Sequence, residues 1–290
     1  MCFIQKENGE IIHNSSSITQ EAKRFYEKLY ASHENDIVNI NIGNVATPTL
    51  SQERSDSLEG PTTLHEALSA FKQMNNDKSP GSNGYTAEFF KFFFSDLGIF
   101  MIRSINYGFY CGQMSVTQRQ GVITCTHKEG KDKQSSCIAA RLKKVLPKLI
   151  SEEQKGFLKG RYKGENTKLL YDTLLYTNKH QVPDLLLMVD FEKAFDCVAW
   201  SFIETSLNKY NFGHDIKRWI SAFYANLNSC MYVNGQYSEW FDVRRCTRQG
   251  DPLSPYLFLM CAEILSSMIH QNKNIHGIKI LDEEILLSQF

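Results

Sequence analysis

V-D-F-E-K-A-F-D, residues 189–196, begins at the last residue of the apolar run Leu185–Val189. The interpretation of the fold starts from this octapeptide. Five apolar residues that end at a carboxylate are typical of a short buried strand. The carboxylate at its end, Asp190, would leave the core and face a cleft, where it suits Mg²⁺. Asp196 is expected to cap the helix that begins near Val198. Alone the motif is ambiguous, because an aspartate at a strand end is more often a turn residue than a metal ligand.

A second distinctive stretch is R-Q-G-D-P-L-S-P, residues 248–255. Its two prolines flank a predicted helix start, and Gly250 allows the backbone to approach a flat ligand closely. Free N–H groups at such a helix start can bind anions. The alternative is an ordinary helix opened by proline, and for the octapeptide alone this is the favoured interpretation.

The rest of the chain mixes helices and strands without a regular β-α-β alternation, which favours an α+β fold. Asn234-Gly235 is a strong signal for a two-residue hairpin turn. Apolar periodicity predicts helices at 19–30, 64–74, 138–149, 198–210, 216–226 and 255–270, and an aromatic helix after Thr86. Strands are predicted at 121–126, 185–189, 230–233, 236–241, 278–281 and 285–287.

Composition excludes several classes of protein. The 290 residues are 42% hydrophobic, which argues against general disorder. The longest apolar stretches, such as 256–262, are too short to cross a bilayer, and no signal peptide opens the chain. The eight cysteines form no C-x-x-C pair, so buried, reduced thiols are expected. These observations predict a protein of the cell interior, cytoplasm and nucleus, with no membrane partner.

The charge distribution is uneven although the net charge is zero. Residues 1–60 carry 5 Lys and Arg against 9 Asp and Glu, whereas residues 121–170 carry 12 against 5. The excess of 12 − 5 = 7 positive charges in the second segment suits a phosphate backbone. A solvated helix face is the equally acceptable alternative.

Taken together in their order, five segments resemble the reverse transcriptases of LINE-type non-LTR retrotransposons. The segments that carry the resemblance are K-S-P-G-S-N-G-Y-T-A-E-F-F-K (78–91), G-V-I-T-C-T-H-K-E-G-K-D-K (121–133), R-L-K-K-V-L-P-K-L-I-S-E-E-Q-K-G-F-L-K-G-R (141–161), V-D-F-E-K-A-F-D (189–196) and R-Q-G-D-P-L-S-P-Y-L-F (248–258). The resemblance implies the fingers and a partial palm of a right-hand polymerase, without a thumb. Its divisions would be a linker or upstream tail at 1–60, fingers at 61–184 and palm at 185–290.

The resemblance also implies roles for individual residues. In such polymerases two Mg²⁺ ions hold the triphosphate and the primer hydroxyl for in-line attack. Asp190 and the carbonyl of Phe191 match the first metal site. Phe195 matches the aromatic that excludes a 2′ hydroxyl, and Gln249 and Gly250 match the segment beside the incoming nucleotide. Two basic residues would lie along the template, namely Lys155 and Arg161.

Two departures from the family pattern bear on activity. The remaining catalytic aspartates of the family lie in an aromatic-Ala-Asp-Asp turn, and no Ala-Asp-Asp occurs in these 290 residues. The return strand with an N-x-R-P-I-S-type segment, whose arginine contacts the triphosphate, is also missing after Lys133, which would leave the strand at 121–126 without an antiparallel partner. The interpretation is therefore a fragment of an RNA-directed DNA polymerase that uses an RNA template, a DNA primer and dNTPs but is inactive alone. A non-catalytic RNA-binding remnant and a translated fossil without function are the alternatives.

Overall fold

The structure is a computed structural model that describes residues 3–6, 8–31, 42–76, 84–124, 135–183, 185–247, 251–280, 283–286 and 288. The helices are α1 (Ser15–Tyr30), α2 (Gln52–Asp56), α3 (Leu64–Gln73), α4 (Ala87–Phe92), α5 (Phe94–Cys111), α6 (Val116–Arg119), α7 (Ser136–Leu149), α8 (Gly164–His180), α9 (Trp200–Lys209), α10 (His214–Tyr224) and α11 (Ser254–Gln271). A short 3₁₀ turn, η2, covers Ile42–Asn44. No helix in these described ranges is both long and apolar enough to span a bilayer.

The helix starts follow from local sequence chemistry. The Thr63 hydroxyl accepts from the Glu66 backbone N–H, while the Glu66 carboxylate accepts from the Thr63 N–H, so α3 opens with a complete capping box. Thr86 caps α4 as expected. The single aromatic helix predicted after it is divided in two at Phe93, whose backbone leaves the helical region (φ −91°, ψ 17°).

The central sheet is small and mixed. Its strands are β3 (Gln120–Thr124), β4 (Asn228–Val233), β5 (Gln236–Tyr237) and β6 (Phe241–Asp242). The Asn234-Gly235 turn is confirmed: both residues have positive φ, and β4 pairs antiparallel with β5 and β6 around it. The strand at 121–126, expected to lack an antiparallel partner, has none among the described strands, but it is not left unpaired. It pairs in parallel with β4, from Gln120 opposite Asn228 to Thr124 opposite Tyr232.

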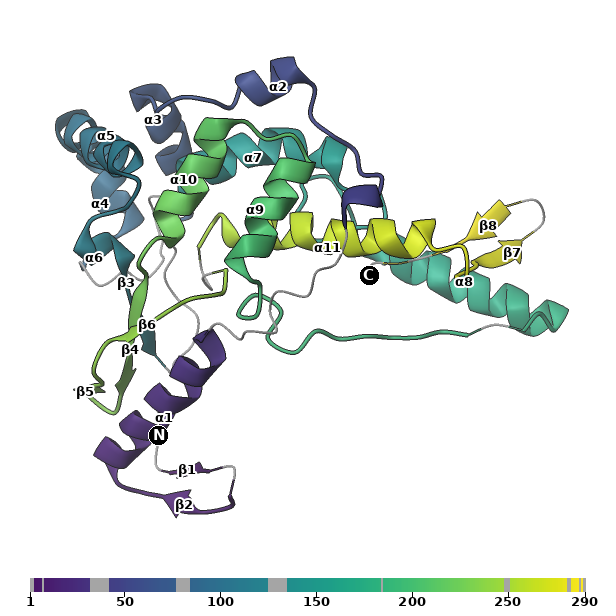
Figure 1. The fold of residues 1–290 in the computed structure, drawn as a ribbon, viewed down its shortest axis with the longest axis horizontal. Coiled ribbons are helices and arrows are strands. Elements are labelled where there is room, and N and C mark those ends of the chain that lie inside the picture. The colour runs from purple at the N-terminus through teal and green to yellow at the C-terminus, as the bar shows by residue number, and fades with distance from the viewer. Residues whose placement is uncertain are drawn as a thin grey trace.

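Two hairpins lie outside this sheet, as Figure 1 shows. One is β1 (Ile4–Gln5) with β2 (Ile11–Ile12), beside α1. The other is β7 (Ile278–Ile280) with β8 (Glu283–Ile285), at the far end of α8. The second confirms the hairpin predicted near 278–287.

The main core forms around α11, which lies across the middle of the molecule in Figure 1. Leu253, Leu257 and Ile264 of this region are fully buried, together with Trp219 of α10. The first 60 residues, expected to be a linker or tail, also enter this core. Their fully or almost fully buried members are Ile18, Leu50 and Leu58.

Arg141 of α7 is buried, although it belongs to the positively charged segment 121–170. Its side chain is only 6% exposed. Its Nε and Nη2 donate to both oxygens of Glu66, at 2.8 and 2.9 Å. Nη1 donates to the carbonyls of Leu58 and Gly60, and Nη2 also to that of Pro61. All five guanidinium hydrogens are therefore used, and they join α7 to α3 and to residues 58–61, which precede α3.

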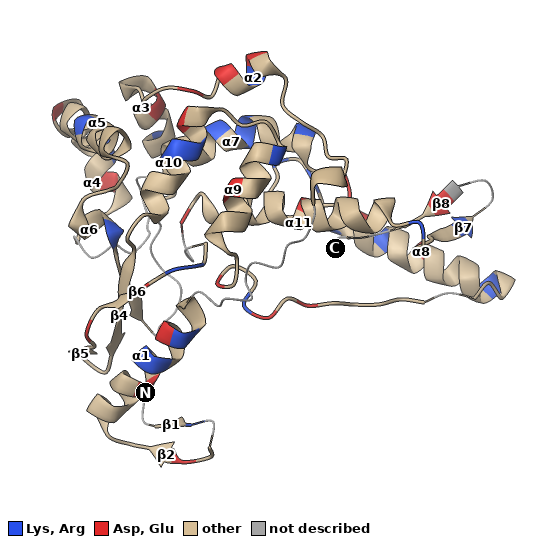
Figure 2. Cartoon of the chain, viewed as in Figure 1, with Lys and Arg blue, Asp and Glu red and all other residues tan. Residues whose placement is uncertain are grey.

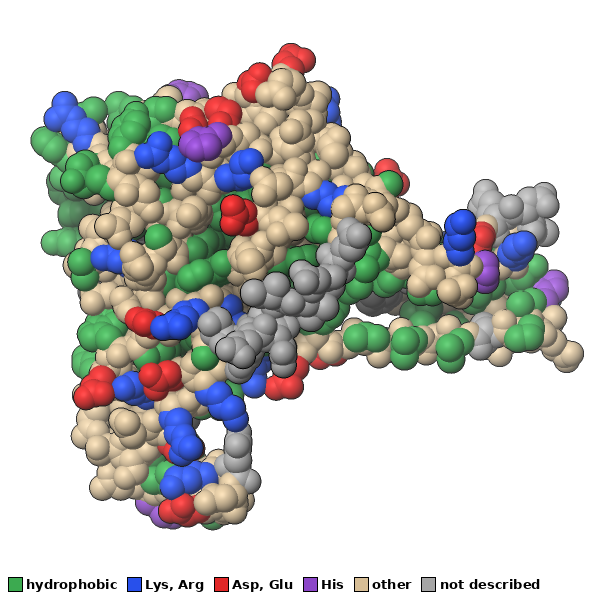
Figure 3. All heavy atoms as spheres, in the orientation of Figure 1, with side chains coloured by type: hydrophobic (Ala, Val, Ile, Leu, Met, Phe, Trp, Pro, Cys, Tyr) green, Lys and Arg blue, Asp and Glu red, His purple; other side chains and the backbone are tan. Residues whose placement is uncertain are grey.

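The run Leu185–Val189 is not a buried strand. The structure leaves it extended and without a strand partner among the described residues, with Leu185 88% and Leu187 77% exposed. Figure 3 shows a row of hydrophobic side chains along this segment, and Figure 1 shows it passing alone beneath α8. The prediction failed because an apolar run becomes a buried strand only where neighbouring strands and a second layer cover it. Among the described strands, β7 and β8 pair with each other and not with this segment.

Candidate functional site

Asp190 lies at the end of this exposed segment, and a tight turn follows it. The turn spans residues 192–196, and Lys193 adopts a left-handed backbone (φ 51°), which is uncommon for a residue with a side chain. The Lys193 ammonium pairs with the Glu192 carboxylate at 2.9 Å. Their hydrogen bond lowers the pKa of Glu192 and raises that of Lys193. Asp190 and Phe191 both face solvent.

The turn is held from one side by the chain that precedes α11. The backbone N–H and the hydroxyl of Thr247 both donate to the Phe195 carbonyl, at 2.7 and 3.1 Å. One residue earlier, the Cys246 N–H donates to the Val198 carbonyl at 3.0 Å, and the Trp200 indole donates back to the Cys246 carbonyl at 2.9 Å. The 189–196 and 248–258 segments are thus joined by hydrogen bonds at their boundaries.

From the other side the turn is held by α1. The Tyr30 hydroxyl donates to a carboxylate oxygen of Asp196 at 3.0 Å, and both residues are buried. The Lys193 ammonium lies 4.7 Å from the centre of the Phe25 ring, a cation–π contact. Asp196 is therefore not the predicted helix cap, because α9 starts only at Trp200, after Ala199. It is an internal acceptor that ties the turn to α1.

Phe195 belongs to a cluster of three aromatic rings. Its ring lies 4.9 Å from that of Phe258 in α11 and 6.1 Å from that of Phe157, which meets it edge-on. Phe195 and Phe258 are half-buried, whereas Phe157 is 57% exposed. The cluster therefore brings together three of the segments singled out in the sequence, 141–161, 189–196 and 248–258.

Gln249 and Gly250 lie outside the described residues, so their predicted place beside Phe195 stays a prediction. The residues on either side are informative. Thr247 donates to the Phe195 carbonyl, and the Asp251 carboxylate accepts from the Leu253 N–H at 2.9 Å, just before α11 begins at Ser254. The same Asp251 oxygen accepts from the Ser135 hydroxyl at the start of α7. The helix start expected between Pro252 and Pro255 is confirmed, because α11 begins at Ser254.

The two residues expected along the template have partners within the chain. The Lys155 ammonium pairs with the Glu165 carboxylate at 2.5 Å. Arg161 donates to the carbonyls of Ser151, Gln154, Pro147 and Ile150 around the end of α7. The structure thus gives Arg161 a role in holding the chain after α7, and a template contact by either residue stays a prediction.

The described residues do not by themselves fit a two-metal site. No three His, Cys, Asp or Glu side chains within the described ranges are close enough together to hold an ion. Asp190 is exposed and supplies one carboxylate, to which the Phe191 carbonyl could add one oxygen. A Mg²⁺ pair in a polymerase geometry needs further carboxylates.

Sequence reasoning missed four residues that hold this site: Phe25, Tyr30, Phe157 and Thr247. The first two belong to the segment 25–30, F-Y-E-K-L-Y. Its aromatic residues indicate that the segment packs against something, but they do not indicate which residues it contacts. Phe157 and Thr247 each lie beside or within a segment that was recognised, but nothing in their residue type separates them from their neighbours.

Comparison with known proteins gives a consistent result. The family described as reverse transcriptase (RNA-dependent DNA polymerase) matches residues 117–289, from α6 through β8. The uncharacterized 149 kDa protein of transposon TX1 from Xenopus laevis is 27% identical over 98% of this chain. The Pol polyprotein of the type-2 retrotransposable element R2DM from Drosophila melanogaster is 26% identical over 62% of it. The Pol polyprotein of a type-1 R2 element from Nasonia vitripennis is 26% identical over 49% of it.

These relatives are much longer than the portion that matches. The chain spans 23% of the TX1 protein, 18% of the Drosophila protein and 14% of the Nasonia protein.

Proposed function

We propose, on the premise that the chain belongs to the reverse transcriptase (RNA-dependent DNA polymerase) family, that it is the fingers and partial palm of a non-LTR retrotransposon polymerase. The observation that supports this best is the family match over 117–289, which includes Asp190, the turn 192–196 and the start of α11. In this proposal an RNA template and a DNA primer lie across the aromatic cluster, and a dNTP occupies the space beside Phe195.

The predicted residues other than Arg161 have the following proposed roles. Asp190 and the Phe191 carbonyl would supply oxygen ligands to Mg²⁺, which neutralises triphosphate charge when it is bound. Phe195 would stack against the sugar, and its packing against Phe258 supports this because a steric gate must be held rigidly. Gln249 and Gly250 would lie next to the base. Lys155 would reach the template only by exchanging its partner Glu165 for a phosphate.

We propose further that these 290 residues are inactive alone. The sequence supplies no Ala-Asp-Asp, and the metal that activates the primer hydroxyl would lack most of its carboxylate ligands. Primer extension with a primed RNA template, dNTPs and Mg²⁺ or Mn²⁺ tests this, with no product above background expected. Template-dependent synthesis that Asp190→Asn abolishes would show that the metal site is complete within this chain.

A complementary experiment tests the family role of Asp190. A version extended at the C-terminus through an aromatic-Ala-Asp-Asp turn should extend the primer, and Asp190→Asn in that version should remove the activity. Asp215→Asn is the control, because Asp215 lies at the start of α10 and accepts from the Gly60 N–H. Equal activity of the extended protein and its Asp190→Asn variant would exclude Asp190 as a metal ligand.

RNA binding without catalysis is the second candidate function. The lysines of α7 favour it, and Figure 2 shows this helix among the most basic parts of the fold.

A further inference from the structure

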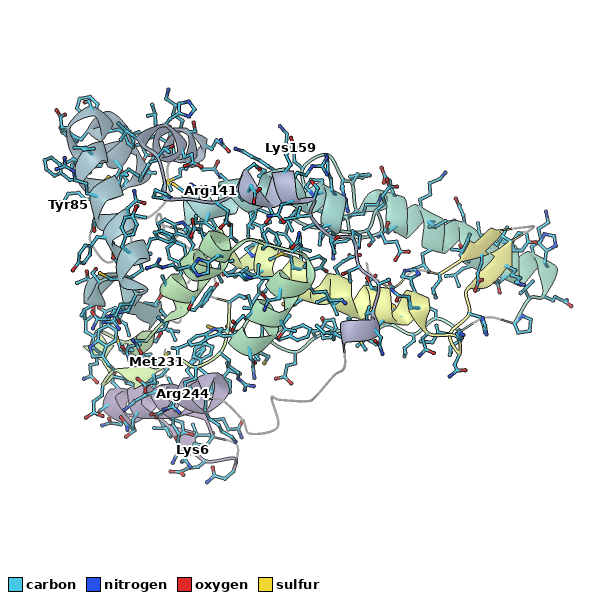
Figure 4. All side chains as sticks on the ribbon, turned by 45° about the horizontal axis from the view of Figure 1, so that its top comes forward. Lys6, Tyr85, Arg141, Lys159, Met231 and Arg244 are labelled. Atoms are coloured by element: carbon cyan, nitrogen blue, oxygen red, sulfur yellow. The ribbon has the colours of Figure 1, made fainter. Side chains whose placement is uncertain are left out.

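A cavity of about 420 Å³ lies between α3, α7 and the loop that carries Lys159. None of its lining residues belongs to the turn 190–196 or to the start of α11, so it is separate from the candidate site above. Figure 4 labels Arg141 and Lys159 on this side of the molecule. The polar side chains that line it, apart from the Glu66–Arg141 pair, are His65, Ser69, Gln73, Lys143, Lys144 and Lys159.

The charges of Glu66 and Arg141 offset each other. Burial by itself raises the pKa of the Glu66 carboxyl, but the hydrogen bonds from Arg141 and the Thr63 N–H outweigh it and hold the pKa at about 2. Glu66 is therefore ionised at neutral pH and fully paired with a guanidinium whose five hydrogens are all used. Neither group is available to a ligand, and the pair forms a rigid, neutral part of the wall.

Three positive charges then remain at the cavity. Lys143, Lys144 and Lys159 are exposed, and none of them makes an ion pair with any acidic residue in the described ranges. Lysine ammonium groups are compact point charges that bind phosphate without fixed geometry. Ser69 and Gln73, on the α3 side, add neutral hydrogen-bonding groups.

We propose that this cavity binds the phosphate backbone of an RNA strand through Lys143, Lys144 and Lys159. RNA as the source of the phosphates rests on the proposed function. The concave shape, the local excess of positive charge and the neutral donors together suit a phosphodiester segment that passes over α7. The site is distinct from a template contact at Lys155, whose ammonium is already paired.

The test measures binding of a labelled single-stranded RNA by fluorescence anisotropy across a range of KCl concentrations. The variant Lys143→Gln/Lys144→Gln/Lys159→Gln is compared with Lys28→Gln/Lys179→Gln/Lys273→Gln. The control removes the same charge from three exposed lysines on other parts of the surface. Because each phosphate contact on a single strand contributes roughly 0.7 to the salt slope, the first variant should lower its magnitude by about two. Its affinity near physiological salt should fall roughly tenfold or more, and the control should stay within about twofold.

Both variants should unfold at the wild-type temperature, since none of the six lysines makes a side-chain hydrogen bond or ion pair with another described residue. Equal losses of RNA affinity in the two variants would overturn the proposal, because the effect would then be net charge alone. Unchanged RNA affinity in the first variant also overturns it, and a thermal shift of wild type with tripolyphosphate would then identify a small-anion site. RNA binding is measured without primer extension. A chain that binds RNA through these lysines but extends no primer would therefore support this inference and contradict a polymerase role.

Discussion

The Tyr30 hydroxyl, near the end of α1, donates a 3.0 Å hydrogen bond to the Asp196 carboxylate, 166 residues later in the chain. Burial and the nearby Asp196 charge both raise the pKa of the Tyr30 phenol, so it is a hydrogen-bond donor at neutral pH. An N-terminal helix that the sequence suggested to be peripheral thus braces the turn that carries Phe195.

Tyr30→Phe should destabilise the fold by about 1–2 kcal/mol, because it removes a buried hydrogen bond to a charged group while keeping the ring. Urea unfolding measures the change. Tyr237→Phe, at a residue 67% exposed, is the matched control and should be neutral. A double-mutant cycle with Asp196→Asn that shows no coupling would contradict the assigned contact.

Arg141→Lys should cost about 3 kcal/mol or more, although charge is retained. Lysine has three donors in place of five and cannot bridge Glu66 and three carbonyls together. Arg103→Lys, on the exposed surface of α5, is the control and should change the free energy of unfolding by no more than about 0.5 kcal/mol. Equal effects of the two substitutions would show that the fork geometry of Arg141 is unimportant.

The stability of the chain should also depend on pH through Glu66. Its pKa is lowered from 4.5 to about 2 on folding, so its contribution is fully present above pH 4.5 and is lost as the pH falls toward 2. Thermal unfolding between pH 6 and pH 2.5 should show an acid loss that is smaller in Glu66→Gln. Parallel curves for wild type and variant would mean that Glu66 titrates alike in the folded and unfolded chain.

Phe195→Val should relax sugar discrimination in the version extended through an aromatic-Ala-Asp-Asp turn. A smaller side chain leaves room for a 2′ hydroxyl, and ribonucleotide use relative to deoxyribonucleotide use should rise about tenfold or more. Phe92→Val is the control, because Phe92 is a phenylalanine of α4 that is 78% exposed and lies outside the aromatic cluster around Phe195. An unchanged preference in Phe195→Val would remove Phe195 from this role.

Local structure was largely predictable from the sequence. The capping box at Thr63, the turn at Asn234-Gly235 and the start of α11 at Ser254 each depend on residues within a few positions of one another. Such signals act through hydrogen bonds and backbone angles of neighbouring residues, so they do not depend on which distant segments pack nearby. The α+β class followed from their order.

Long-range partners were not predictable in the same way. The parallel pairing of β3 with β4 joins residues 108 positions apart, and nothing in either strand specifies the other. Arg141 carries the same charge as its exposed neighbours Lys143 and Lys144 on α7. It nevertheless faces α3, where it is buried and donates to Glu66. The buried strand predicted at Leu185–Val189 was wrong for a different reason. An apolar run indicates that burial would be favourable, but it does not show that other elements cover it.

That uncovered segment has a practical consequence for handling the protein. Leu185–Val189 is extended, apolar and free of proline and charge, and its backbone pairs with no described strand. α8 adds Tyr171 and Leu175, both at least half exposed, on an element that Figure 1 places alongside. Extended segments of this kind template strand pairing between molecules, so the isolated chain should form oligomers as its concentration rises. The substitution Leu187→Lys should keep the protein monomeric, as measured by light scattering, without lowering its unfolding temperature.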